Sequence, residues 1–304
     1  MRIHFIRLLA FAPLAFLGAC ATTFPPHAFL PGDTHDKIVS TEVIVPVRQS
    51  EMYVYVPPST AGSSAGAAFG LLGALAGVIV DSSVNSIRTS KAEAAVKPLR
   101  DSMVDYNFDT TLQADLKTSL GTAPWLGAND IRGVREVTPD ALDLALTNSK
   151  AGAVLFVTTD YHLDNDGNVL TITAQASVFP NNDALRAFAS TKAKGPKSAL
   201  PNSIYHNTLT FEAKVAGGTD NRDANMATWS ASNGAAMRSV LSVGAKELAQ
   251  MLAVDLQRTD DTISSDAAPI TIDGQAGHVV ASDDDGTAIR FPDGTLKFAA
   301  KSAL

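Results

Sequence analysis

Two extended runs joined by a short polar turn constrain the fold of this chain most strongly. The first, AVLFVTTDYHL, covers residues 153–163, and the second, VLTITAQASVF, covers residues 169–179. Both are rich in β-branched and aromatic residues, which favour strands. The turn between them, DNDGN, contains the Asp and Gly residues that β-hairpin turns favour. The sequence therefore predicts an antiparallel hairpin in the middle of the chain.

Helical and extended patterns surround this hairpin. Thr138 begins the run TPDALDLAL, with a proline at the first helical position, and predicts a capped helix. Residues 208–215 alternate as a half-buried strand does, with one apolar face formed by Leu209, Phe211, Ala213 and Val215. Residues 233–256 predict a long helix whose apolar stripe is formed by Met237, Val240, Leu241, Leu248, Met251 and Leu252. This order predicts an α+β fold, with helices packed on an antiparallel or mixed sheet.

Earlier in the chain, apolar residues recur every four positions at Phe108, Leu112, Leu116 and Leu120. This spacing predicts a short amphipathic helix that Asp109 caps and Gly121 terminates. Two other runs, KIVSTEVIVPV and EMYVYVPP, predict either a hairpin or two successive strands.

Composition divides the chain into seven stretches. They are a signal peptide (1–19), a lipidated tether (20–37), β-strands (38–60), a glycine-rich helical segment (61–97), an α+β domain (98–256), a linker (257–269) and a small C-terminal β-meander (270–304). Within this division, Pro98 is expected to end one helix and start another. His27 and His35 are expected to be solvated in the tether.

The N-terminus reads as an export signal, with Arg2 and Arg7 before an apolar stretch and small residues before Cys20. The run Leu17-Gly18-Ala19-Cys20 resembles the lipobox of bacterial lipoproteins. The resemblance implies cleavage before Cys20, a covalent lipid that includes palmitate on that cysteine, and, from Ala21, sorting to the outer membrane. Because Cys20 is the only cysteine, the mature chain has no disulfide, zinc cluster or cysteine nucleophile.

The element order and the hairpin of residues 138–256 resemble the TolB amino-terminal domain. Lipoproteins that secrete curli and lipoproteins that activate penicillin-binding proteins use a domain of this type. The resemblance implies an α/β domain that works in the cell envelope.

The charge of the chain argues against two classes of partner. Removal of residues 1–19 takes two of the 24 basic residues and none of the 31 acidic ones, which leaves a net charge of −9. Nucleic acid is therefore not expected as a partner, since its binding requires clustered Lys and Arg. Electrostatic attraction to anionic lipid is not expected either.

The stretch AGSSAGAAFGLLGALAGVIV at residues 61–80 contains no charge and resembles a glycine zipper. Its glycines are four residues apart, at Gly62, Gly66 and Gly70 and again at Gly73 and Gly77. Small residues on one helix face permit another helix to approach closely, and twenty residues are enough to span a bilayer. Membrane contact or self-association through these glycines, and simple packing inside the body, both remain open.

Residues 62–66 also match the G-x-S-x-G pattern of a hydrolase nucleophile elbow, with Ser64 as the nucleophile. Pro57 and Pro58 separate the motif from the preceding strand, although an elbow needs that strand to end directly at the turn. Chance occurrence in a Gly/Ser/Ala-rich stretch is the preferred interpretation.

Two acidic turns resemble calcium loops only superficially. Asp164, Asp166 and Gly167 form one, and Asp283, Asp285 and Gly286 the other, but neither has a Glu at the twelfth position. Both are predicted to be hairpin turns. His162 and His206 are expected on neighbouring strands, where they can approach each other without a third metal ligand.

The sequence thus predicts a non-enzymatic lipoprotein at the periplasmic face of the outer membrane, anchored by the lipid on Cys20. We expect no catalytic residue, metal site or other cofactor. The expected partners are the membrane, through the lipid, and an unidentified envelope protein, with a homo-oligomer as a further possibility. A membrane-active oligomer or pore component that uses residues 61–80 is the alternative, followed by a serine hydrolase that uses Ser64.

Overall fold

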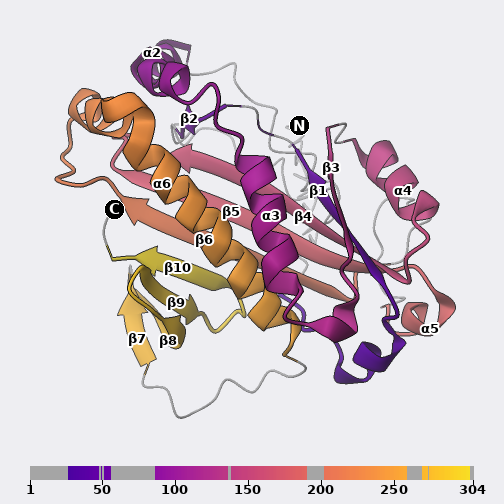
Figure 1. Cartoon of the computed structure of the whole chain (residues 1–304). Coiled ribbons are helices and arrows are strands. Elements are labelled where there is room, and N and C mark those ends of the chain that lie inside the picture. The colour runs from indigo at the N-terminus through magenta and orange to yellow at the C-terminus, as the bar shows by residue number, and fades with distance from the viewer. Residues whose placement is uncertain are drawn as a thin grey trace, which may run out of the picture.

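A computed structural model of the chain describes residues 27–47, 49, 51–55, 86–135, 138–189, 202–258, 269–272 and 274–301. The strands are β1 (Thr41–Pro46), β2 (Tyr53–Val54), β3 (Asp130–Val134), β4 (Ala153–Leu163), β5 (Val169–Pro180), β6 (Tyr205–Lys214), β7 (Pro269–Ile272), β8 (Gln275–Ser282), β9 (Gly286–Arg290) and β10 (Leu296–Ala300). The helices are η1 (Gly32–Lys37), α2 (Ser86–Ser102), α3 (Phe108–Leu120), η4 (Pro124–Leu126), α4 (Pro139–Asn148), α5 (Asp183–Arg186) and α6 (Arg222–Leu256). Figure 1 shows these elements together.

The ten strands form one mixed sheet in the order β3-β1-β4-β5-β6-β10-β9-β8-β7, and β2 pairs with β4 beside this path. The predicted hairpin is confirmed as β4 and β5, paired from Ala153 opposite Pro180 to Leu163 opposite Leu170. The predicted C-terminal meander is confirmed as β7 to β10. Its last strand pairs in parallel with β6, so the meander continues the central sheet.

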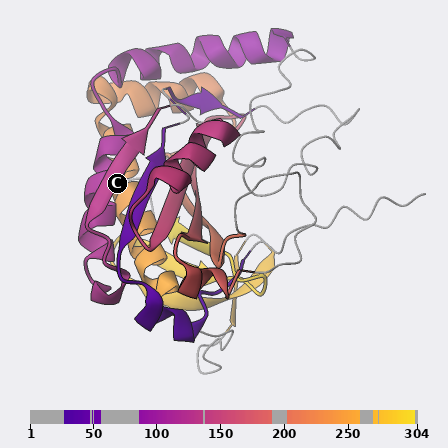
Figure 2. The same cartoon turned by 90° about the vertical axis from the view of Figure 1, so that its right-hand side faces the viewer.

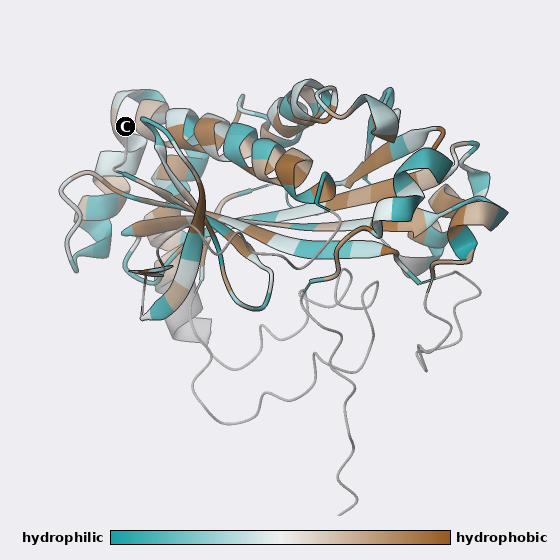
Figure 3. Cartoon of the chain, turned by 90° about the horizontal axis from the view of Figure 1, so that it is seen from below, coloured by the Kyte–Doolittle hydropathy of each residue, from teal (hydrophilic) through white to brown (hydrophobic). Residues whose placement is uncertain are grey.

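Helices α2, α3 and α6 lie on one face of the sheet, and α4 lies on the other (Figures 1 and 2). The larger core lies under α2, α3 and α6 and includes the apolar faces of β5, β6 and β10. Figure 3 shows the alternation of apolar and polar residues along the central strands. A smaller core under α4 consists of Ile44, Leu142, Leu146, Val154, Phe156 and Phe179. The α+β fold with helices packed on a mixed sheet is therefore confirmed.

The predicted helix at residues 108–120 is confirmed as α3, but its predicted cap is wrong. Asn107 caps the helix, because its Oδ1 accepts the backbone N–H of Thr110 at 3.0 Å. Asp109 lies in the first turn, where its negative charge faces the positive end of the helix dipole. A capping residue must stand just outside the helix in an extended conformation, as Asn107 does.

Element α6 contains the predicted helix and, before it, a further helical stretch that begins at Arg222 and was not predicted. It contains a kink at Ala231–Gly234, where Ser232, Asn233 and Gly234 have positive φ values of 51°, 59° and 69°. A Cβ at Gly234 would lie 2.8 Å from Ser102 Oγ, so glycine permits the close approach of α2 to the kink. All six residues of the predicted apolar stripe are buried.

The two early strands do not form a hairpin. Both β1 and β2 pair in parallel with β4, β1 from Thr41 opposite Ala153 and β2 from Tyr53 opposite His162. Nor does Pro98 separate two helices, because α2 runs through it to Ser102. Proline removes one backbone N–H, and here the helix ends within the next turn, which limits the disruption.

Candidate functional site

Most of the predicted site residues lie outside the described part of the chain. They are the predicted lipidation site, the predicted nucleophile and the five glycines of residues 61–80, that is Cys20, Ser64, Gly62, Gly66, Gly70, Gly73 and Gly77. Their roles remain predictions. The nearest described residues on either side of residues 61–80 are Tyr55, after β2, and Ser86, at the start of α2.

Aromatic and acidic side chains gather where β2 lies beside the end of β4. The hydroxyl of Tyr53 donates to the carboxylate of Asp160, 2.9 Å from both oxygens, and His162 Nδ1 lies 3.0 Å from Asp160 Oδ1. The ring of His162 lies 5.4 Å from the ring of Tyr53 and 5.5 Å from that of Tyr55. Such cross-strand contacts hold a two-residue strand in place.

The two strand histidines do not approach each other, which corrects the expectation from the sequence. His162 is opposite Thr171 of β5, whereas His206 is opposite Ser177, six residues farther along the same strand. Six residues of a strand extend over about 20 Å. Because β5 lies between their strands and the register offsets them, His162 and His206 cannot share a ligand.

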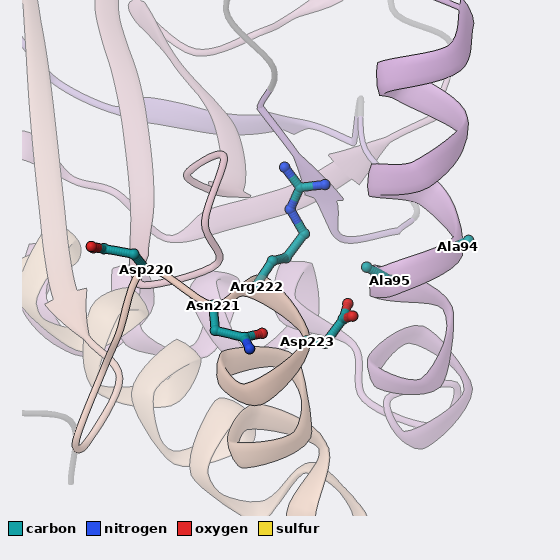
Figure 4. Close-up of a pocket in the computed structure, with 6 residues that line it drawn as sticks. All are labelled: Ala94, Ala95, Asp220, Asn221, Arg222 and Asp223. Atoms are coloured by element: carbon teal, nitrogen blue, oxygen red, sulfur yellow. The ribbon is translucent and has the colours of Figure 1, made fainter.

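A pocket of about 650 Å³ lies between α2 and the beginning of α6 (Figure 4). Ala94 and Ala95 form one wall, and residues 220–223 form the other. The side chain of Arg222 is engaged in holding the β4–β5 turn, because its Nε donates to the carbonyl oxygen of Asn165 and its Nη2 to Asn165 Oδ1 at 2.8 Å. None of the six lining residues is a Ser, Thr or Cys nucleophile.

The acidic turn between β4 and β5 is used for packing against α6. Asn225 Nδ2 donates to the carbonyl oxygen of Asp166 at 2.8 Å, and Trp229 Nε1 donates to that of Gly167 at 2.8 Å. Asp164 Oδ1 accepts the backbone N–H of Asn168. These contacts confirm a hairpin turn, and two of its carbonyl oxygens serve as acceptors for side chains of α6.

Three carboxylates of the described residues lie close enough to share a cation. Oxygen atoms of Glu247, Asp283 and Asp285 lie within 4.8 Å of one another. Lys246 already brings a positive charge to this group, since its Nζ lies 3.0 Å from Glu247 Oε1 and 3.2 Å from Asp285 Oδ2. Burial raises the pKa of the Glu247 carboxyl, and the nearby lysine partly opposes the shift. The group is therefore an ion-pair cluster centred on a lysine.

A fully buried charged site lies at the C-terminal end of α6. There the carboxylate of Asp255, with no exposed surface, accepts a bond from Arg290 Nη2 at 2.6 Å. The same carboxylate accepts bonds from the Tyr205 hydroxyl at 2.8 Å and from Asn207 Nδ2 at 2.6 Å. Three elements that are distant in sequence, β6, α6 and β9, therefore meet at one buried charge.

Burial alone would raise the pKa of Asp255. The neighbouring His27 imidazole, the charge of Arg290 and the amide of Asn207 lower it, and the balance leaves the pKa below its ordinary value. The carboxylate is therefore ionised at neutral pH, as a charge paired with Arg290 must be.

This cluster was not predicted from the sequence, although α6 contains a signal for it. Asp255 stands four residues after Met251 and three after Leu252, on the apolar stripe of a buried helix. A charged residue in that position requires a buried partner. The partner, Arg290, lies in a strand whose local pattern gives no indication of which helix it faces.

Two histidines that were expected to be solvated are packed against the body. The side chain of His27 is 4% exposed, and its Nε2 lies 3.5 Å from Asp255 Oδ2. His35 stacks on Trp125 with a distance of 3.8 Å between ring centroids, and burial lowers its pKa. The expectation for His27 and His35 is therefore wrong, because residues 27–37 pack on the sheet and helices.

Among the helices that the structure describes, none combines the length and the apolar character needed to cross a bilayer. Comparison of the chain with models of protein families, with curated proteins and with solved structures gives no match.

Proposed function

We propose that this chain is a lipid-anchored lipoprotein of the bacterial cell envelope. It acts as a non-enzymatic accessory or assembly factor at the periplasmic face of the outer membrane, through contacts with another envelope protein. The observation that carries this proposal is the run Leu17-Gly18-Ala19-Cys20 after a signal-like segment, with Cys20 as the only cysteine.

The position of the folded body supports this proposal. The side chain of the first described residue, His27, is 4% exposed, and His27 stands only seven residues beyond Cys20. Seven residues reach at most about 25 Å when fully extended. A lipid on Cys20 would therefore keep the body close to the membrane surface, where envelope proteins can meet it.

The sheet also offers a way to bind a protein. Among the described strands, β3 and β7 stand at the two ends of the sheet order, so each has a partner on one side only. A strand at the edge of a sheet can pair with an extended segment of another protein. On its inner side, β3 pairs with β1 (Thr41–Pro46), and β7 pairs with β8 (Gln275–Ser282).

Metabolic labelling with a palmitate analogue tests the anchor. We expect the full chain to incorporate the label and to fractionate with outer membranes, and the Cys20→Ser variant to do neither. The variant Val39→Ala, at an 83% exposed position of the body, serves as the control and is expected to be labelled normally. An unlabelled full chain would overturn the proposal.

The spacing of Gly62, Gly66, Gly70, Gly73 and Gly77 favours a second candidate, a membrane-active oligomer or pore component.

The described residues on either side of this stretch limit how it would enter a membrane. Tyr55 and Ser86 both belong to the described body and would lie on the same side of a bilayer. After a span at residues 61–80, the five residues 81–85 would reach about 20 Å, less than the roughly 30 Å of the hydrocarbon core. If the second candidate holds, residues 61–80 therefore contact the membrane without crossing it completely.

Liposome flotation of residues 21–304, which lack Cys20, separates the two candidates. If the first holds, this fragment stays with the soluble fraction. Flotation with the vesicles, abolished by Gly70→Leu or Gly73→Leu, would favour the membrane-active oligomer.

A further inference from the structure

The four residues 27–30, which we call the strap, occupy part of one edge of β6. The backbone N–H of Ala28 donates to the carbonyl oxygen of His206 at 2.8 Å, and the N–H of His206 donates to that of Ala28 at 3.2 Å. Because β5 takes the opposite edge of β6, the strap lies on the edge that β10 joins three residues later, at Leu209. The strap and β10 therefore pair with successive parts of the same edge of β6.

The first side chain of the strap packs on the turn between β9 and β10. A Cβ at Gly294 of this turn would lie 2.4 Å from His27 Nδ1, so the imidazole rests directly on the glycine. The imidazole ring also lies 4.0 Å from the ring of Phe29 and 6.4 Å from that of Tyr205, in edge-to-face geometry. His27 thereby touches both β6 and the turn of the meander.

The other side chains of the strap help to cover the buried ion pair. The ring of Phe29 lies 5.6 Å from the guanidinium carbon of Arg290 and 5.7 Å from that of Arg258, and Leu30 is fully buried. Beneath the strap, Arg290 Nη1 donates to the carbonyl oxygen of Gly294 at 3.1 Å. The ion pair therefore holds the turn of the meander, and the strap helps to keep the ion pair away from water.

One strand of the meander, β10, joins it to the rest of the sheet, and its Leu296 and Phe298 side chains also pack in the larger core. The junction of β10 with β6 consists of four residue pairs, from Leu296 opposite Leu209 to Ala299 opposite Glu212. The Lys297–Glu212 ion pair at 2.7 Å and the stacking of Phe298 on Phe211 add to it. The buried ion pair lies at the end of this junction and adds to these contacts.

We propose that the strap is a latch that fixes the C-terminal meander to the body. When residues 27–30 leave the edge of β6, water reaches the Asp255–Arg290 pair, the β9–β10 turn loses its cover, and the junction of β10 with β6 loosens. The β4–β5 hairpin lies on the other side of β6 and keeps its pairing. One bridge with two backbone hydrogen bonds holds the main chain of the latch, and the packed side chains of His27, Phe29 and Leu30 hold the rest.

The position of the latch couples the N-terminus of the chain to the state of the meander. A pull on Cys20 would act first on the strap, seven residues away. This consequence rests on the proposed lipidation of Cys20, whereas the latch itself depends only on contacts inside the body. Failure of the labelling experiment would therefore leave the latch in place.

Hydrogen exchange of the mature chain, residues 20–304, tests the latch. We expect Phe29→Ala to accelerate amide exchange in residues 286–300 by about tenfold and to leave residues 153–163 unchanged. Ala28→Pro, which removes the N–H that donates to His206, is expected to have the same local effect. Val39→Ala, at an 83% exposed position between η1 and β1, is the matched control and is expected to change neither region. Unchanged exchange at 286–300, or equal acceleration in both regions, would overturn the proposal.

Discussion

Asp255 of α6 and Arg290 of β9, 35 residues apart in the sequence, form an ion pair of 2.6 Å that is almost completely buried. Removing two charges from water is costly, and the cost is offset only when each remaining polar atom has partners. Tyr205, Asn207 and the carbonyl oxygen of Gly294 provide partners for the carboxylate and for Arg290 Nη1, whereas Arg290 Nε has no hydrogen-bond partner among the described residues. The pair therefore determines how α6, β6 and the meander meet.

Arg290→Met should lower the free energy of unfolding by about 3–5 kcal/mol, because it leaves the carboxylate of Asp255 buried without a counter-charge. Urea denaturation measures the loss. Arg186→Met is the matched control, since Arg186 pairs at 3.4 Å with an Asp183 side chain that is 99% exposed. The control should lose less than about 1 kcal/mol. Equal losses in the two variants would contradict a special role for the buried pair.

Glu247→Gln should change the dependence of stability on pH. Burial raises the pKa of Glu247 above its ordinary value of 4.5, so the folded state binds this proton more tightly than the unfolded state does. Stability from this group is therefore lost as the pH rises from the ordinary pKa through the raised one. Relative to Glu247→Gln, the wild type should become less stable as the pH rises above the ordinary pKa of 4.5, as measured in urea titrations. A stability difference that stays constant with pH would show that the pKa is not raised.

Asn107→Ala should destabilise the protein by about 1 kcal/mol, because it removes the side-chain oxygen that caps α3. Asp109→Asn serves as the comparison. The Asp109 side chain accepts no capping bond, and the substitution preserves its size. Because burial raises the pKa of Asp109, loss of its charge should cost less than loss of the cap. Thermal unfolding of both variants measures the difference. A larger loss for Asp109→Asn would restore Asp109 as the cap.

Ser64 should not react with a fluorophosphonate probe on the folded protein. The strand β2 ends at Val54, and Pro57 and Pro58 stand between it and the motif, whereas a nucleophile elbow begins directly at a strand end. Mass spectrometry of the probe-treated chain checks the prediction, with Ser64→Ala as the blank. A label on Ser64 that this variant abolishes would establish a hydrolase-like serine.

The elements that were predicted well are those whose signals are local. Thr138 caps α4 through a 3.2 Å bond to the backbone N–H of Ala141, three residues away. The β4–β5 hairpin follows from two strand-like runs and the short turn between them. In β6, Leu209 and Phe211 are buried and Thr210 is less so, as alternation requires. Neighbours in sequence make these interactions, so a single stretch of sequence contains the information.

The cap of α3 shows that local sequence does not always decide even a short-range interaction. Asn107 and Asp109 are both suitable capping residues near the start of the same apolar pattern. The backbone conformation decides between them, since Asn107 is extended and Asp109 is helical. Which residue caps the helix thus depends on where packing of Phe108 in the core starts the first turn.

The sequence by itself determined the α+β class, the hairpin, the meander and the apolar stripe of α6, because periodicity shows which face of an element avoids water. Only the tertiary structure decided that β10 pairs in parallel with β6, that His27 is buried, and that Arg290 is the partner of Asp255. These contacts join segments that are distant along the chain. Each depends on which apolar faces are buried together and on the register that follows, and no local pattern contains that choice.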